Sequence, residues 1–215
     1  MQTGVLKDEL LLYAITCEGV ELSILEKQVD DALVGGATII QLREKNLSED
    51  EYLQKALAVK SVCSQRGVRL IVDDSLAVAV KSGADGIHIG QDDVSAREAR
   101  RVLGDDKIVG VSTKTVEQAK LAEASGADYL GVGAIYPTKT KSAPIMTSIE
   151  TLAAICRAVS IPVVAIGGIK RFNMSPLRGT GISGVAVVTG IFAAPDVREA
   201  AADLRAEAER VVWNR

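Results

Sequence analysis

Short runs of aliphatic residues alternate with longer amphipathic stretches along the whole chain. In several of the runs, of which 163–166 is one, apolar residues follow one another almost without interruption. Uninterrupted runs of this length are typical of parallel strands that helices cover on both faces. The pattern predicts strands over residues 10–16, 38–42, 69–72, 86–89, 108–112, 129–133, 163–166 and 184–188.

The stretches between these runs carry helix-start signals. A hydroxyl residue followed three positions later by Glu or Gln can satisfy two backbone N–H groups at a helix N-terminus. The helices end at glycines, and only a short helix is expected around Ser175-Pro176 after the seventh strand. The predicted capping pairs are Ser23/Glu26, Ser48/Glu51, Ser95/Glu98, Thr115/Gln118 and Thr147/Glu150.

Eight strand–helix units follow one another with no linker or charge block between them. This organisation predicts the α/β class and a single (β/α)8 TIM barrel with a parallel eight-stranded core, one domain over residues 1–215. The main alternative is an open doubly wound sheet. A nucleotide-binding sheet of that kind would place GxGxxG after its first strand, where this chain has Thr16-Cys17-Glu18-Gly19.

Composition narrows the function classes. The 25 Lys and Arg residues against 28 Asp and Glu residues give a net charge of -3, and aromatic residues make up 3% of the chain. These numbers argue against nucleic acid as a partner, because both the basic surface and the stacking platforms are missing. No run approaches the ~20 apolar residues that span a membrane, so we expect no membrane partner, a cytoplasmic location and small-molecule substrates. Self-association into a homo-oligomer stays open.

In a barrel of this kind, the loops after the strands converge on one mouth, where polar residues of this chain are concentrated. The loops after the last two strands are the commonest phosphate site of such barrels, which points to Gly167, Gly168, Val188 and Thr189. The alternative is that Gly167-Gly168 is only a tight turn. His88, the sole histidine, lies between two isoleucines and is expected to be a packed strand residue rather than an acid or base.

Asp74 and Asp93 follow adjacent strands, so their carboxylates could share one hard divalent cation, for which Mg²⁺ is the natural candidate. Asp73, Asp74 or Ser75 could instead cap the following helix. The cations Arg43, Lys45 and Lys141 exceed what one monophosphate requires, so a metal-bound diphosphate and a separate monophosphate form a reasonable ligand set. The alternative for each cation is a solvated position on the rim.

Several phrases together resemble the thiamine-phosphate synthase family over essentially the whole chain. The phrases are 12–16 LYAIT, 41–45 QLREK, 86–91 GIHIGQ with Asp93, 110–112 GVS, 137–141 PTKTK, 165–169 AIGGI and 184–188 GVAVV. QLREK and GQxD are specific, whereas the Gly-Gly and GVAVV phrases occur in many phosphate-binding barrels.

The resemblance implies a Mg²⁺-dependent transferase that joins hydroxymethylpyrimidine diphosphate to hydroxyethylthiazole phosphate, giving thiamine phosphate and diphosphate by a dissociative substitution. Arg43, Lys45 and Lys141 would stabilise the departing diphosphate, and Asp74 and Asp93 would hold the ion. The pyrimidine-diphosphate contacts implied are Gln41, Leu42, Arg43, Glu44, Lys45, Ser112 and Lys141. The thiazole-phosphate contacts implied are Thr138, Lys139, Thr140, Gly168, Val188 and Thr189.

Two positions depart from the family pattern. Asp73 stands where the family usually has an Asn that contacts the pyrimidine, and Thr189 stands where Ser is common. An ionised carboxylate accepts hydrogen bonds but cannot donate them, so Asp73 leaves room for a non-catalytic phosphate-binding paralogue. The other alternative is a thiazole tautomerase-like isomerase, but that family carries a histidine near the position of Lys114.

Overall fold

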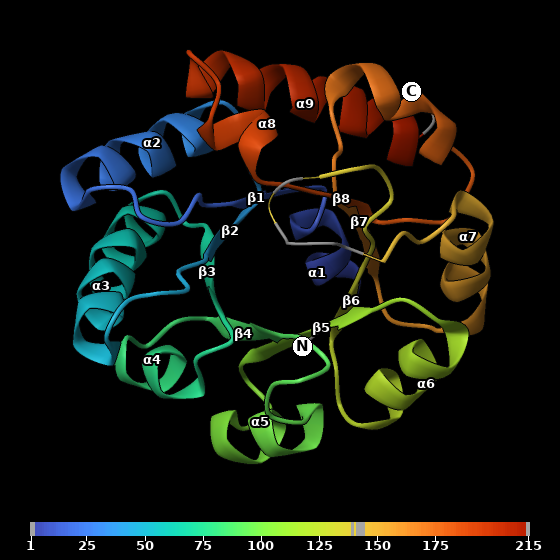
Figure 1. Ribbon diagram of the computed structural model, residues 1–215, viewed down its shortest axis with the longest axis horizontal. Helices are drawn as coiled ribbons and strands as arrows, with labels where there is room; N and C mark the ends of the chain where they lie inside the picture. Colours follow the sequence, from blue (N-terminus) through green and yellow to red (C-terminus); the bar gives the residue numbers. More distant parts are fainter. Residues whose placement is uncertain (1–2, 139, 141–144, 214–215) are drawn as a thin grey trace.

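The computed structural model describes residues 3–138, 140 and 145–213. Eight parallel strands form a closed barrel in sequence order, and helices surround it (Figure 1). The predicted (β/α)8 architecture is therefore confirmed. The strands are β1 (Leu12–Ile15), β2 (Ile39–Leu42), β3 (Arg69–Asp73), β4 (Gly86–Ile89), β5 (Ile108–Thr113), β6 (Tyr129–Val132), β7 (Val163–Ile166) and β8 (Gly184–Val187).

Helices follow the strands as the alternating pattern predicted, and α1 precedes β1. After β7 the chain makes only the short 3-10 turns η1 (Arg171–Asn173) and η2 (Ser175–Leu177), as expected. Within the described residues, no helix has the length and apolar character needed to cross a membrane. The helices are α1 (Thr3–Glu9), α2 (Leu22–Val34), α3 (Glu49–Gln65), α4 (Leu76–Lys81), α5 (Ala96–Leu103), α6 (Val116–Ala124), α7 (Ile149–Ala158), α8 (Thr189–Phe192) and α9 (Val197–Val212).

Three of the five predicted N-caps are confirmed, because Ser48, Ser95 and Thr115 each accept a hydrogen bond from the backbone N–H three residues on. The other two were placed wrongly. Glu21 caps α2, so Ser23 lies inside the first turn. Ser148 rather than Thr147 caps α7. In both cases another side chain able to accept lies within two residues of the predicted one, and the periodicity cannot choose between them.

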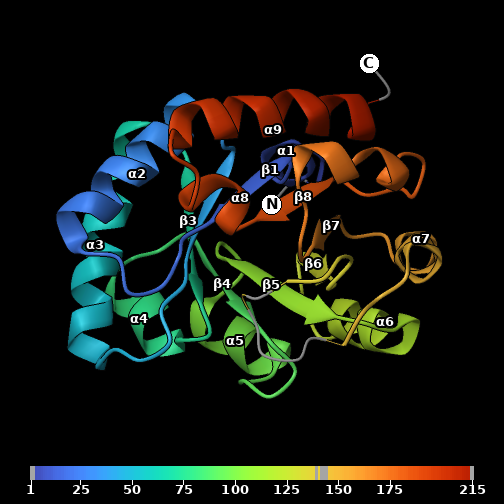
Figure 2. The same ribbon diagram turned by 45° about the horizontal axis from the view of Figure 1, so that its top comes forward.

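The interior of the barrel is filled from its N-terminal end. Leu6 of α1 packs with Leu10 and with inward-facing residues of the strands, including Ile71 and Ile108, in one buried cluster. Figure 1 shows α1 in the middle of the ring, and Figure 2 shows it beside β1 and β8. Because apolar side chains close this end, a ligand can enter only at the opposite mouth, where the strands end.

One hydrogen-bonding arrangement recurs before the even-numbered strands. The Asp85 carboxylate accepts from the Leu70 backbone N–H at 2.8 Å, and Asp128 accepts from Val109 at 2.8 Å. Thr38 does the same for the N–H of Leu12, at 2.9 Å. These side chains satisfy backbone donors at the starts of the preceding strands, which fixes the register of neighbouring strands.

Candidate active site

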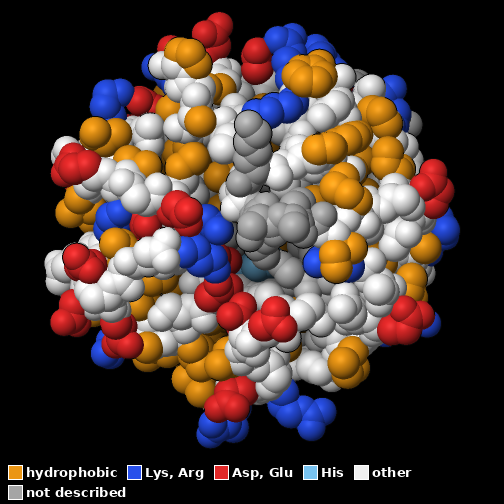
Figure 3. Space-filling view, viewed as in Figure 1, with side chains coloured by type: hydrophobic (Ala, Val, Ile, Leu, Met, Phe, Trp, Pro, Cys, Tyr) orange, Lys and Arg blue, Asp and Glu red, His pale blue; other side chains and the backbone are white. Residues whose placement is uncertain are grey.

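A cavity of about 380 Å³ opens at the C-terminal mouth of the barrel. Lys, Arg, Asp and Glu side chains gather on the left of the central hollow in Figure 3, which is the side of β2–β4 in Figure 1. The mouth is therefore the polar end of a barrel whose other end is apolar. The predicted site residues that line this cavity are Gln41, Arg43, Asp73, Ser112, Thr138, Thr140, Gly168, Val188 and Thr189.

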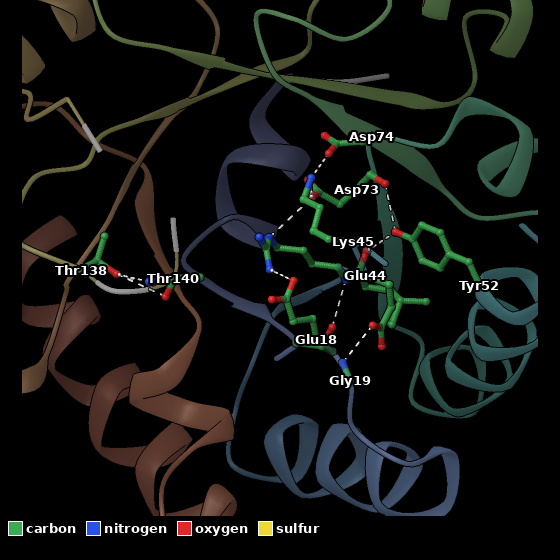
Figure 4. Close-up of polar contacts among 12 residues, drawn as sticks. Glu18, Gly19, Glu44, Lys45, Tyr52, Asp73, Asp74, Thr138 and Thr140 are labelled. Atoms are coloured by element: carbon green, nitrogen blue, oxygen red, sulfur yellow. Dashed lines mark hydrogen bonds and ion pairs between the residues drawn. The ribbon is translucent and has the colours of Figure 1, made fainter. Parts of the chain in front are cut away.

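Arg43 and Lys45 extend from the end of β2 over the carboxylates that follow β3. The Arg43 guanidinium lies 3.0 Å from the Glu18 carboxylate and 3.8 Å from that of Asp73. Lys45 Nζ lies 3.4 Å from Asp73 and also pairs with Asp74, as Figure 4 shows. Because each cation already has acidic partners, a phosphate ligand would have to compete with carboxylates for it.

Asp73 is the last residue of β3, so the structure corrects the prediction that β3 ends at Val72. Its carboxyl group is buried, and its backbone carbonyl accepts a hydrogen bond from Tyr52 at 2.9 Å. Burial, reinforced by the negative charge of Asp74, raises the pKa of Asp73 to about 6 although Lys45 and Arg43 oppose the shift. This carboxyl group therefore takes up a proton more readily than an exposed aspartate.

Asp74 and Asp93 are close enough for their carboxyl groups to hydrogen-bond to each other. Burial and this contact with Asp74 raise the pKa of Asp93, whose carboxylate also accepts from the Gly90 N–H at 2.7 Å. Asp74 takes a left-handed backbone conformation with φ of 59°. Ser75 caps α4, which leaves the neighbouring aspartates free of that task and removes the capping alternative.

The charge balance on this side fits a divalent cation. Among the described residues, the carboxylates of Glu18, Asp73, Asp74 and Asp93 face only two cations, Arg43 and Lys45. The excess of two negative charges equals the charge of one Mg²⁺ ion. No group of three or more His, Cys, Asp and Glu side chains in the described part of the chain is arranged to hold a metal. Water and substrate oxygens would therefore complete the coordination, as is usual for Mg²⁺.

Leu42 and Glu44 are not among the residues that line the cavity. Leu42 is fully buried in the core between strands and helices. The Glu44 carboxylate turns away from the mouth and binds Lys55 Nζ at 2.6 Å and the Gly19 N–H at 2.9 Å (Figure 4). The alternation of side chains along β2 explains both positions, since Gln41 and Arg43 point inward and their neighbours do not. Glu44 therefore anchors the β1–α2 loop rather than facing a ligand.

The opposite side of the cavity is formed mainly by backbone and small residues of β6–β8. Gly167 and Gly168 have φ values of 98° and 63°, and a Cβ on Gly168 would lie 2.5 Å from the Pro137 carbonyl oxygen. The side-chain amide of Asn173 donates to the Gly168 carbonyl at 3.0 Å, which fixes the turn. Thr138 lies on this side too, with its hydroxyl accepting from the Thr140 N–H at 3.2 Å (Figure 4).

The predictions for Lys139 and Lys141 fall outside the described residues. Their place at the mouth therefore stays a prediction of the sequence.

His88 is packed within β4 as expected, and it also lines the cavity. Its Nε2 lies 2.9 Å from the Ser112 hydroxyl, and its Nδ1 lies 2.9 Å from the hydroxyl of the fully buried Tyr129. Tyr13, Glu18, Tyr52 and Lys55 are further partners of the site that the sequence pattern did not single out. For Tyr13 and Tyr129, the available signal was their inward position on a strand of alternating residues.

Comparison with known proteins agrees with this geometry. Residues 12–191 match the family model described as thiamine monophosphate synthase. A thiamine-phosphate synthase of Clostridium tetani is 46% identical over 84% of this chain and 86% of its own length. Thiamine-phosphate synthase 2 of Streptococcus pneumoniae is 50% identical over 89% of this chain and 91% of its own length.

Solved structures agree in fold. The thiamine phosphate pyrophosphorylase of Pyrococcus furiosus superposes with a TM-score of 0.87 at 36% identity, covering 96% of this chain and 99% of its own. A 3-hexulose-6-phosphate synthase, at 19% identity and a TM-score of 0.71, shares the barrel alone. Family model, relatives and fold agree, and the chain belongs to the thiamine monophosphate synthase family.

Proposed function

We propose that this protein is a Mg²⁺-dependent transferase that joins hydroxymethylpyrimidine diphosphate to hydroxyethylthiazole phosphate, with release of diphosphate. One observation carries the proposal. In a chain of this family, a cluster of carboxylates and cations faces a cup of glycine backbone across a single cavity. Two phosphorylated substrates could occupy the two sides at once.

On the charged side, Arg43 and Lys45 would bind the diphosphate of the pyrimidine substrate. Both cations are held by carboxylates at the mouth, so they are in place before charge develops on the departing group. Stabilisation by groups that need not reorganise is the largest contribution in many enzymes. Lys141 is proposed for the same role on the evidence of the PTKTK phrase alone. Gln41 and Ser112, which line the cavity floor, would contact the pyrimidine ring.

Asp74 and Asp93 would hold the Mg²⁺ ion, and their mutual contact supports this assignment. When bound, the ion neutralises negative charge on a diphosphate leaving group. The role of this chain is to hold two carboxylates together on adjacent strand ends. Loss of the diphosphate needs no nucleophilic side chain, so the mechanism assigns neither His88 nor a cysteine as a nucleophile.

On the other side, the backbone around Gly168, Val188 and Thr189 would bind the thiazole monophosphate, with Thr138 and Thr140 beside it. Backbone N–H groups near positive-φ glycines approach an anion closely because no Cβ intervenes. An acceptor anchored there would wait next to the pyrimidine carbon, which favours capture by the thiazole nitrogen over capture by water.

A single incubation tests the proposal. The purified protein with both substrates should form thiamine phosphate and diphosphate when Mg²⁺ is added, and none after chelation with EDTA. No product at any Mg²⁺ concentration, with ligand binding retained, would instead support the non-catalytic paralogue. The tautomerase-like alternative finds no support, because the named relatives are synthases and Lys114 replaces the expected histidine. Cytoplasmic location and self-association stay expectations for fractionation and sedimentation to test.

A further inference from the structure

A chain of hydrogen bonds crosses the floor of the cavity. Gln41 Nε2 donates to the Tyr13 hydroxyl at 2.9 Å, and that hydroxyl lies 2.7 Å from the hydroxyl of Tyr129. The Tyr129 hydroxyl lies 2.9 Å from His88 Nδ1, and His88 Nε2 lies 2.9 Å from Ser112 Oγ. We call these five residues, from β1, β2, β4, β5 and β6, the relay. Its two ends, Gln41 and Ser112, both line the cavity.

The relay has a direction. With the Gln41 amide oriented as in the structure, the Tyr13 hydroxyl accepts from Gln41 and gives its single proton to Tyr129. Tyr129 then donates to His88 Nδ1, which must be the unprotonated nitrogen of a neutral ring. The proton of His88 consequently sits on Nε2 and is donated to Ser112 Oγ. Each step follows from the one before it because a hydroxyl carries only one proton.

Burial keeps this order from being scrambled by solvent. Tyr13 is 1% exposed and Tyr129 is fully buried, so water cannot readily replace their partners. Hydrogen bonds in such surroundings polarise one another, and a buried group left without a partner is costly.

The barrel is shaped to hold the relay. A Cβ at Gly110 would lie 2.1 Å from Cζ of Tyr129, and a Cβ at Gly131 would lie 3.1 Å from Cε1 of His88. Glycines at these two strand positions leave space that the rings of the relay fill. This observation is independent of the hydrogen bonds and points to the same three side chains.

We propose that Tyr13, Tyr129 and His88 are positioning residues that fix the hydrogen-bonding polarity of Gln41 and Ser112. The relay leaves the Gln41 carbonyl oxygen as an acceptor and the Ser112 hydroxyl as a donor toward the cavity. Resting on the proposed function, this pair selects a substrate ring that carries an amino group next to a ring nitrogen. A ring with the opposite order, a carbonyl beside a ring N–H, would meet two mismatched groups.

The first test reads the proton order directly and needs no substrate. His88 is the sole histidine of the sequence, so the imidazole nitrogen signals of the isotope-labelled protein belong to it alone. At neutral pH we expect a neutral ring with its proton on Nε2, and we expect Tyr129→Phe to shift the Nδ1 signal. Tyr52→Phe, which removes a buried hydroxyl outside the relay, should leave that signal in place. A proton on Nδ1, a doubly protonated ring or an unshifted Nδ1 signal in Tyr129→Phe overturns the proposal.

The second test is a double-mutant cycle on substrate affinity. Tyr13→Phe and Tyr129→Phe should each raise the KM for the pyrimidine diphosphate by about tenfold, as expected for one lost hydrogen bond. The double variant should be no worse than the weaker single variant, because either change breaks the same path. The KM for the thiazole phosphate should not move. Multiplying effects, or equal rises in both KM values, would mean that the tyrosines act only through folding.

The two tests separate the two claims. If the wild-type protein makes no product, the proposed function fails while the nitrogen signals still decide the proton order. If product forms and the nitrogen signals contradict the predicted order, only the relay is lost.

Discussion

The two sides of the cavity differ in what presents the binding groups. On the β2–β4 side, ionised side chains such as Arg43, Lys45 and Asp74 face the cavity already paired with one another. On the β6–β8 side, the turn at Gly167-Gly168 presents backbone and is fixed by its own conformation. The comparison teaches that the first side can exchange partners when a charged ligand arrives, whereas the second side is preorganised. Substitutions should therefore damage the two sides in different ways.

The largest effect should come from the carboxylates. We expect Asp74→Ala or Asp93→Ala to lower kcat/KM by about a hundredfold or more, because the charge on the departing diphosphate is no longer neutralised. Thiazole-phosphate affinity, measured by calorimetry, should survive because that ligand sits on the other side. Asp106→Ala, an exposed acid before β5, serves as the control. Equal loss of both ligands in either variant would contradict the separation of the two sides.

The second effect concerns the preorganised side. Gly168→Ala would force a side chain into a φ of 63° and toward the Pro137 carbonyl oxygen. We expect a loss of thiazole-phosphate affinity of about tenfold or more and a stability loss of about 1–3 kcal/mol. Diphosphate-side affinity should change little.

Gly179→Ala is the matched control for this strain. Gly179 has a φ of 78°, but nothing lies within 4 Å of its missing Cβ. It should show the conformational cost without the loss of affinity. If both variants lose ligand equally, general backbone strain rather than the shape of the cup is responsible.

Sequence pattern was sufficient for the barrel because each element is specified locally. The strand runs, the caps at Ser48 and Ser95 and the Asp85-type contacts all follow from neighbours in sequence or in the next unit. The cavity side of the site was equally accessible where residues alternate along a strand, as at Gln41 and Arg43. Failures came where tertiary partners decide. Nothing near Glu44 in sequence shows that Lys55 and Gly19 turn its carboxylate away from the mouth.

The pKa of Asp73 distinguishes the charged side by a third, smaller effect. Its folded-state pKa of about 6 lies above the ordinary value of 3.8. Protonation therefore stabilises the fold below about pH 4, and this contribution is lost as the pH rises through about 6. We expect Asp73→Asn, which cannot ionise, to be more stable than the wild type above pH 6 by about 1–2 kcal/mol.

Urea unfolding in EDTA, at matched pH values on either side of this window, measures the difference. The advantage of Asp73→Asn should shrink toward zero as the pH falls to about 4. An advantage that is independent of pH would show that ionisation of Asp73 is not its source.

The smallest effect should come from a hydroxyl on the preorganised side. Thr189 is exposed at the start of α8, and in the proposed site the backbone around it carries most of the phosphate contact. Thr189→Val should therefore raise the KM for the thiazole phosphate by only about threefold, the contribution of one modest hydrogen bond. Thr189→Ser keeps the hydroxyl and should behave as the wild type. A loss in Thr189→Val as large as that of Gly168→Ala would mean that side chains, not backbone, bind the ligand on both sides of the cavity.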